Sequence, residues 1–123
     1  MIPFVVVGSE AILRGDQGVT EMINKIHQVQ SKVSLPVTTA EPWHIWLAHP
    51  SLMKEADIIF VNIFPYWETT PIDRAVDFVW EKIQAIKTQA QGKRVVISET
   101  GWPSHGSANG EAIPSLSLSL IHI

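Results

Sequence analysis

The sequence predicts an α/β fold in which parallel strands alternate with helices, as in a partial (β/α)8 barrel. Apolar, strand-like runs alternate with amphipathic helical segments along the 123 residues, which are enough for one domain. A polar or aromatic cluster follows each of the four expected strands, and no phosphate-binding glycine loop follows any of them. Together these observations favour a barrel segment with a site at its strand ends.

The four strand-like segments differ in length but share an apolar composition. Residues 2–8 and 57–64 are rich in β-branched and aromatic side chains, which predicts strands buried on both faces. Shorter strands are predicted over residues 37–40 and 94–98. Strands of this kind are typical of a parallel sheet that is covered by helices.

Helical periodicity separates these strands. Residues 19–33 carry apolar side chains at spacings of three and four, which predicts an amphipathic helix with Thr20 as a cap near its start. A short helix is predicted over residues 50–56. A long helix is predicted to begin near Pro71, a residue favoured in a first turn, and to end at Gly92.

Two parallel architectures fit this alternation, an open doubly wound sheet and a closed barrel. The sequence has neither a Gly-x-Gly-x-x-Gly nor a Walker loop after a strand, which weakens the nucleotide-binding version. Barrel enzymes build their sites at the C-terminal ends of the strands, where this sequence carries carboxylates and aromatic residues. Because a complete barrel has eight strands over roughly 250 residues, four strands indicate either a fragment or a half-barrel that must dimerise.

The composition argues against several classes of function. The net charge is −3 with scattered Lys and Arg, so we expect neither nucleic-acid binding nor membrane contact from this segment. No apolar run approaches the ~20 residues of a membrane-spanning helix. Residues 1–7 lack the features of a signal peptide, and a strand is already predicted from residue 2, which suggests that the chain starts inside a larger domain. With no cysteine and no ligand spacing among the histidines, we expect no metal site.

Glu10 and Glu99 are the candidate catalytic residues. Each directly follows a short apolar strand, where a carboxyl group is held rigidly and partly shielded from water at the barrel mouth. Glycosidases cleave their bond with two carboxyl groups, one protonated and one ionised. Either glutamate alone could equally be a capping or surface residue, so the assignment depends on the motifs around it.

Those motifs resemble a known enzyme family at four places. Residues 97–104, Ile-Ser-Glu-Thr-Gly-Trp-Pro-Ser, resemble the nucleophile signature of glycoside hydrolase family 17, the β-1,3-glucanase family. Residues 7–16, Val-Gly-Ser-Glu-Ala-Ile-Leu-Arg-Gly-Asp, are similar to its acid/base segment on barrel strand four. Residues 37–43 and 62–68 resemble its strand-five and strand-six ends, particularly in the bacterial branch. The resemblance covers residues 3 to about 106 and implies a fragment spanning about strands 4 to 7 of a (β/α)8 barrel.

The resemblance implies a mechanism and a substrate. It makes Glu10 the general acid/base and Glu99 the nucleophile of a retaining enzyme, with carboxyl groups about 5–5.5 Å apart. The implied activity is that of an O-glycosyl hydrolase on β-1,3-glucan polysaccharide or oligosaccharide, similar to a glucan endo-1,3-β-glucosidase and without a cofactor. Two alternatives are a β-glucan transglycosylase and an inactive truncated fragment or carbohydrate-binding half-barrel.

Aromatic residues at the strand ends are expected to bind sugar. Flat indole faces can stack on the C–H faces of a sugar, and we favour this role for Trp67 and Trp102 over core packing. Core packing is favoured for Trp46 and Trp80. For His44, a position in the wall of the cleft and a position elsewhere are equally compatible with the sequence. By the resemblance, the strand-six Tyr66 would hydrogen-bond the nucleophile. The predicted substrate-binding residues are Ser9, Glu41, Trp43, Tyr66, Trp67, Glu68 and Trp102.

Ser9 departs from the family pattern. Members of the family normally have Asn immediately before the acid/base residue, where it would hydrogen-bond the sugar 2-hydroxyl. The shorter Ser9 would need a bridging water, and losing such a contact costs on the order of 2–4 kcal/mol in the transition state. A single base separates Asn from Ser codons, so a sequencing error is the alternative. We expect a change in turnover rate rather than in substrate class.

The end of the sequence departs from the barrel pattern. A strand would also show the Ser/Leu alternation that begins at Ser115, but residues 118–123 are what CTG TCT CTT ATA CAC ATC encodes, which looks like a sequencing-library transposon adapter. We therefore expect the catalytic domain to cover residues 1–106 and residues 107–123 to be a non-native or disordered tail. We also expect the full-length protein to be periplasmic, extracellular or membrane-associated.

Overall fold

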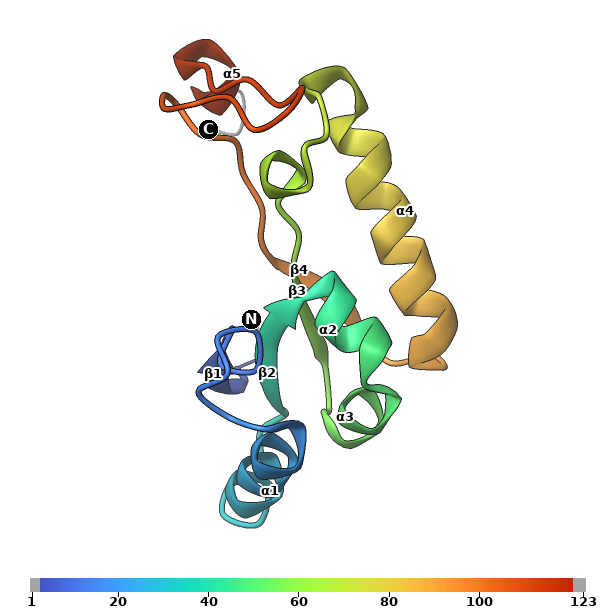
Figure 1. Cartoon of the computed structure of the whole chain (residues 1–123). Coiled ribbons are helices and arrows are strands. Elements are labelled where there is room, and N and C mark those ends of the chain that lie inside the picture. Colours follow the sequence, from blue (N-terminus) through green and yellow to red (C-terminus); the bar gives the residue numbers. More distant parts are fainter. Residues whose placement is uncertain (1–2, 121–123) are drawn as a thin grey trace.

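The computed structural model describes residues 3–120 and contains a four-stranded parallel sheet with helices packed along it (Figure 1). Strand order across the sheet follows chain order, and every neighbouring pair is parallel. Such a sheet requires a crossover between successive strands, which the helical segments provide. The predicted α/β class is confirmed. The strands are β1 (Val5–Ser9), β2 (Val37–Pro42), β3 (Ile59–Asn62) and β4 (Val95–Glu99).

Each crossover between successive strands contains at least one helix. None of the helices among residues 3–120 has the length and apolar character required to cross a membrane. The helix directly after β2 was not predicted, because its six residues are too few to show a helical period. In chain order the helices are α1 (Val19–Gln30), α2 (Trp43–Ala48), α3 (Pro50–Glu55), the 3-10 helix η1 (Pro65–Glu68), α4 (Ile72–Ala90) and α5 (Leu116–Leu120).

The helix ends differ in detail from those predicted. The N-cap of α1 is Gly18 rather than Thr20, and the Gly18 amide donates a hydrogen bond to Glu21 Oε2 at 3.3 Å. At the C-terminal end of α4, the residue that ends the helix is Gln91 rather than Gly92, and its φ of 51° is already left-handed. In α1 the side chain of the third helical residue, Glu21, therefore satisfies the backbone amide of the capping glycine.

The main core lies between the sheet and the helices. Trp46 is fully buried there, and its indole N–H donates to the Phe60 carbonyl oxygen at 2.8 Å. Met22 and Ile26 of α1 pack in the same cluster as Ile86 of α4. The expected packing role of Trp46 is confirmed, and the core fixes the crossover helices against the sheet.

The two outer strands are less buried than predicted. Every residue of β2 and β3 is buried, whereas β1 and β4 alternate between half-buried and exposed positions. The prediction that residues 2–8 form a strand buried on both faces is wrong for Val6, which is 41% exposed. Within residues 3–120, β1 and β4 each pair with one strand only, so the sheet leaves both of its edges open.

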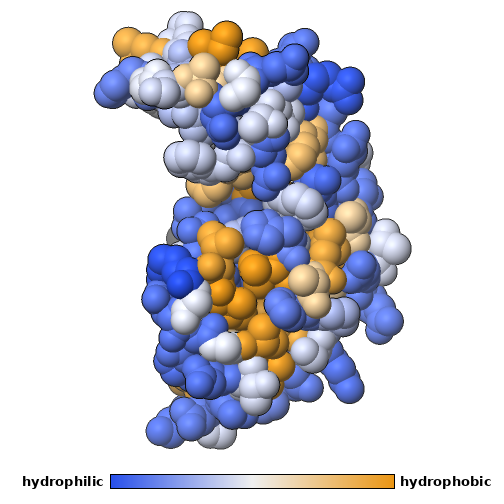
Figure 2. Space-filling view, in the orientation of Figure 1, coloured by the Kyte–Doolittle hydropathy of each residue, from blue (hydrophilic) through white to orange (hydrophobic). Residues whose placement is uncertain are grey.

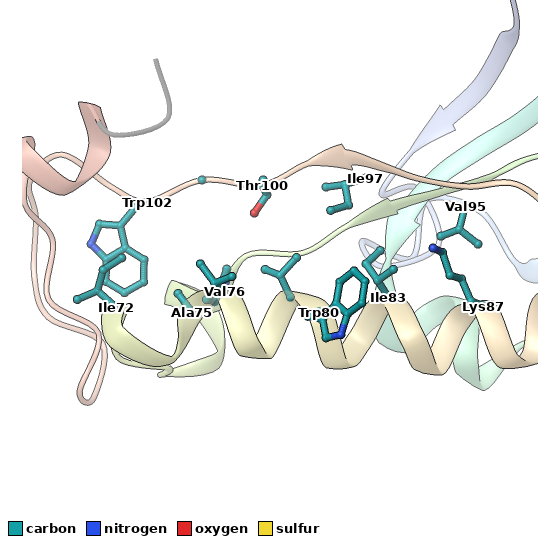
Figure 3. A pocket seen from close by; sticks show the side chains of 13 residues that line it. Ile72, Ala75, Val76, Trp80, Ile83, Lys87, Val95, Ile97, Thr100 and Trp102 are labelled. Atoms are coloured by element: carbon teal, nitrogen blue, oxygen red, sulfur yellow. The ribbon is translucent and has the colours of Figure 1, made fainter.

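An apolar groove lies between α4 and β4 (Figure 3). It has a volume of about 510 Å³ and is lined from the helix by Val76 and Trp80 and from the strand by Val95 and Ile97. Val76 is 79% exposed and Trp80 is 62% exposed. The expected core packing of Trp80 is therefore wrong for the described residues, since none of them covers this side of α4. Figure 2 shows further apolar surface open to view in the middle of the molecule.

Because of these open surfaces, we expect the 123-residue chain produced alone to aggregate and to be inactive. Size-exclusion chromatography and a thermal melt followed by circular dichroism test this. Charging the groove in a Val76→Lys/Trp80→Lys double variant should raise the monomeric fraction. Gln84→Lys, an exposed position on the same helix, is the control and should change little. A soluble wild-type monomer with a cooperative melt and glucanase activity would contradict the prediction.

Candidate active site

An irregularity in the sheet precedes each candidate carboxylate. Between residues 6 and 9, β1 has one residue more than the facing part of β2. Between residues 97 and 99, β4 has one residue more than the facing part of β3. Extra residues of this kind bend a strand locally and change the direction of the side chains that follow. Glu10 and Glu99 thus both lie where the regular pairing is interrupted.

The two glutamates line one cavity at the carboxyl ends of the strands. Its volume is about 610 Å³, within the range of small-molecule sites. The strand order places Glu10 and Glu99 at opposite edges of the sheet, so the cavity spans its full width. Apolar, aromatic and acidic side chains complete the wall. The lining residues are Glu10, Leu13, Pro42, Trp43, His44, Asn62, Phe64, Trp67, Glu68 and Glu99.

Glu10 has an uncommon backbone conformation. Its φ is 52°, in the left-handed region that non-glycine residues seldom adopt and that clusters at functional sites. Its amide donates to the Ala40 carbonyl oxygen at 2.8 Å, and its carbonyl oxygen accepts from the Arg14 amide at 3.0 Å. The peptide groups on both sides of Glu10 are therefore held, and its half-buried side chain is directed into the cavity.

The strand that leads to Glu10 packs closely against its neighbours at Gly8. A Cβ atom on Gly8 would lie 2.7 Å from the Met22 Cε atom and 3.1 Å from Thr39 Oγ1. Thr39 Oγ1–H also donates to the Gly8 carbonyl oxygen at 2.9 Å. Glycine at this position lets α1 and β2 approach β1, which fixes the strand two residues before the carboxylate.

A chain of hydrogen bonds joins the two edges of the sheet. Ser98 Oγ–H donates to Asn62 Oδ1 at 2.6 Å, and Asn62 Nδ2–H donates to Glu10 Oε1 at 2.9 Å. Asn62 is almost fully buried and lies opposite Glu99 in the sheet register. Sequence reasoning did not single out Asn62 or Ser98 as site residues. The available signal was a polar residue at the end of an otherwise apolar strand.

Glu41 is fully buried and lies outside the residues that line the cavity. Its Oε1 accepts from the Ile12 amide at 3.1 Å, and its Oε2 accepts from the Leu13 amide at 3.4 Å. Burial raises the pKa of Glu41 above its ordinary value, and the charge of Glu10 acts in the same direction, against the lowering effect of the two amides. Glu41 was predicted to contact sugar, but its carboxylate contacts protein backbone instead.

Ser9 also lies outside the cavity lining, although it precedes Glu10. It is exposed, and its carbonyl oxygen accepts from Arg14 Nη1 at 2.9 Å. Because Glu10 has a left-handed backbone conformation, the side chains of Ser9 and Glu10 point in different directions. Arg14 in turn pairs with Asp16 at 2.9 Å, so the loop after Glu10 is closed by polar contacts on its outer side.

Trp43, Trp67 and Glu68 are brought together in the cavity wall. The Trp43 indole N–H donates to Glu68 Oε1 at 3.2 Å, and Lys82 Nζ lies 4.2 Å from the centroid of the Trp43 ring. Trp67 is 70% exposed, which leaves its indole open to a ligand. His44 also lines the cavity. These positions suit side chains that contact sugar rings.

Tyr66 and Trp102 lie in a different cluster from the one predicted. The Tyr66 hydroxyl donates to the Ser107 carbonyl oxygen at 2.6 Å rather than to Glu99. Trp102 is 6% exposed, and its indole N–H donates to the Ile113 carbonyl oxygen at 2.9 Å. The segment after β4 folds back beyond the strand ends (Figure 1). Its backbone carbonyl oxygens accept the hydrogen bonds of both side chains.

Part of the predicted tail contributes to this cluster. Ala112 is fully buried and packs with Ala75 and Trp102. Residues 121–123 of the tail lie outside the described residues. The non-native origin of residues 107–123 stays a prediction, which the codons of the nucleotide sequence would test.

Paired glutamates at the ends of parallel strands, facing one cavity walled by indoles, define a glycoside hydrolase domain. Within residues 3–120, no group of three His, Cys, Asp or Glu side chains could hold a metal ion. The model of the BtgE/BtgC glycoside hydrolase domain matches residues 1–122, and the chain belongs to this family.

Similar proteins come from fungi. The chain is 35% identical to "Probable beta-glucosidase btgE" of Aspergillus fumigatus, with 100% of this chain and 23% of that protein covered. It is 30% identical to "Glucan 1,3-beta-glucosidase BGL2" of Candida albicans, with 94% of this chain and 44% of that protein covered. The expected bacterial branch is not supported by these relatives. The chain spans less than half the length of either protein.

Solved structures confirm the partial barrel. The glycoside hydrolase family 17 β-1,3-glucanosyltransferase from Rhizomucor miehei is similar with a TM-score of 0.84 at 35% identity. The match covers 93% of this chain and 43% of that one. An active-site mutant of the same Rhizomucor miehei enzyme, in complex with laminaritriose, gives a TM-score of 0.85 at 34% identity. The four described strands therefore correspond to part of the α/β barrel of those enzymes.

Proposed function

We propose that this chain forms part of the catalytic domain of a retaining O-glycosyl hydrolase that acts on β-1,3-glucan. One observation carries the proposal: Glu10 and Glu99 line a single cavity at the carboxyl ends of the strands. The names of the Aspergillus and Candida relatives, which include a glucan 1,3-β-glucosidase, support a β-linked glucan as substrate. The laminaritriose complex of the Rhizomucor miehei enzyme supports the same substrate class.

The proposed reaction has two steps. In the first, the Glu99 carboxylate attacks the anomeric carbon while Glu10 donates its proton to the departing glycosidic oxygen. In the second, Glu10 takes a proton from water, whose oxygen attacks the anomeric carbon and releases Glu99. Asn62 Nδ2–H, at 2.9 Å from Glu10 Oε1, holds the acid/base carboxyl group in both steps.

Transglycosylation is the second candidate, because the Rhizomucor miehei proteins of similar fold are glucanosyltransferases. A sugar hydroxyl would then replace water in the second step and give up its proton to Glu10. Product analysis of the full-length protein with laminari-oligosaccharides separates the two outcomes. Products longer than the substrate indicate transfer, and shorter products alone indicate hydrolysis. Absence of any product would contradict both and favour a binding or inactive barrel segment.

Trp67→Ala in the full-length protein should raise KM for laminari-oligosaccharides by up to about tenfold. Loss of one aromatic contact with a ring costs about 0.5–1.5 kcal/mol, and 1.4 kcal/mol corresponds to a factor of ten in binding. Steady-state kinetics measure the effect. Trp80→Ala is the control, because Trp80 lines the α4–β4 groove and not the cavity of the two glutamates. An unchanged KM for Trp67→Ala would remove Trp67 from the sugar site.

A further inference from the structure

We propose that Glu41 is a positioning residue for Glu10. Its buried carboxylate holds the loop that follows Glu10 and thereby keeps Glu10 in the left-handed conformation that directs its side chain into the cavity. The inference rests on the proposed function, in which Glu10 is the acid/base residue.

The contacts of Glu41 show what it holds. Its two carboxylate oxygens accept from the successive amides of Ile12 and Leu13, at 3.1 and 3.4 Å. Hydrogen bonds from amides to a carboxylate are stronger than those between neutral groups. These amides belong to the second and third residues after Glu10. No other backbone acceptor is recorded for either amide within residues 3–120, so Glu41 is the anchor of this part of the loop.

Glu10 needs such an anchor. A positive φ in a residue with a side chain persists only where the surrounding structure imposes it. The chain does not enter regular structure again until α1 begins at Val19. Glu41 therefore supplies the fixed point between Glu10 and that helix. Without it, the loop could relax and turn the carboxyl group of Glu10 away from the cavity.

Two further contacts connect Glu41 to the strand before Glu10 and to the loop after it. Thr39 Oγ1 lies 3.5 Å from Glu41 Oε1 and donates to the Gly8 carbonyl oxygen at 2.9 Å. Leu13, whose amide Glu41 holds, lines the cavity with its side chain. The buried carboxylate is thus joined to the strand before Glu10, to the loop after it and to the cavity rim, while it does not line the cavity itself.

The test compares two substrates in the full-length protein. One is a laminari-oligosaccharide, whose sugar leaving group needs a proton from Glu10. The other is 2,4-dinitrophenyl β-laminaribioside, whose phenolate leaves without one, so kcat/KM does not depend on the acid. Glu41→Ala should lower kcat/KM about 10²-fold on the oligosaccharide and no more than about threefold on the dinitrophenyl substrate.

Two more variants complete the comparison. Glu41→Gln keeps one acceptor oxygen and should lose about tenfold on the oligosaccharide, so it carries the test if Glu41→Ala does not fold. Asp57→Ala is the matched control, because Asp57 Oδ2 accepts from the Val37 amide at 2.8 Å at the opposite end of β2. It should lower kcat/KM equally on both substrates, by a few-fold at most.

Each outcome decides the proposal. Equal losses on both substrates for the Glu41 variants, or no loss on either, would overturn the positioning role. Hydrogen exchange gives a readout independent of activity: Glu41→Gln should lower the protection of the Ile12 and Leu13 amides, and unchanged protection would overturn the proposal. A wild-type protein inactive on both substrates would instead refute the proposed function, and amide exchange would still decide whether Glu41 anchors the loop.

Discussion

Replacing Glu99 by Gln in the full-length protein should lower kcat on laminari-oligosaccharides by more than about 10⁴-fold, as removal of a catalytic nucleophile does in other enzymes. The amide of Gln is a poor nucleophile, so no glycosyl–enzyme ester can form. The fold should be retained, because Gln has nearly the same shape. Reducing-sugar release and a thermal melt measure the two effects.

Glu81→Gln is the control for Glu99→Gln. Glu81 is an exposed carboxylate on α4 and lies outside the cavity lining, so its loss should leave kcat within about twofold of wild type. Wild-type activity in Glu99→Gln would show that the nucleophile is another residue and would remove the main support for the proposed mechanism.

Replacing Glu10 by Gln should have an effect that depends on the leaving group. On laminari-oligosaccharides kcat/KM should fall about 10²–10⁴-fold, because general acid catalysis is lost. On a dinitrophenyl glycoside kcat/KM should stay near the wild-type value. Added azide should then raise kcat on the dinitrophenyl substrate, since an anion attacks the glycosyl–enzyme ester without a general base and releases a glycosyl azide.

Glu21→Gln is the control for Glu10→Gln, because Glu21 is exposed, caps α1 and lies outside the cavity lining. It should behave as wild type on both substrates and show no response to azide. Equal losses on both substrates for Glu10→Gln, without azide rescue, would contradict its assignment as the acid/base residue.

Much of the fold could be predicted from local sequence patterns. The apolar run over residues 57–64 contains β3, which is buried along its whole length as expected. The same composition in β1 gave a wrong expectation, because burial of an edge strand depends on what pairs with it. The α2 helix was missed, since its six residues are held by burial of Trp46 rather than by a repeated pattern.

That Glu10 and Glu99 line one cavity could be predicted, because each follows a strand and parallel strands bring their carboxyl ends to one edge. The roles of Asn62 and Ser98 could not be predicted, since their contact depends on the extra residue in β4 and on the register between β3 and β4. Glu41 lies close to the cavity as predicted, but the direction of its side chain could not be predicted, because it depends on the loop after Glu10 that supplies its amide partners. Tyr66 was misplaced because its partner, Ser107, lies 41 residues further along the chain.

In the proposed mechanism, Glu99 forms a covalent glycosyl–enzyme ester in the cavity that it shares with Glu10. The most direct test is to treat the full-length protein with a 2-deoxy-2-fluoro-β-laminaribiosyl fluoride and to locate the label by tandem mass spectrometry of its tryptic peptides. The fluorine at carbon 2 slows hydrolysis of the ester, so the intermediate accumulates. We expect one label, on Glu99 in the peptide that begins at Val95. A label on another carboxylate of an active protein would contradict it.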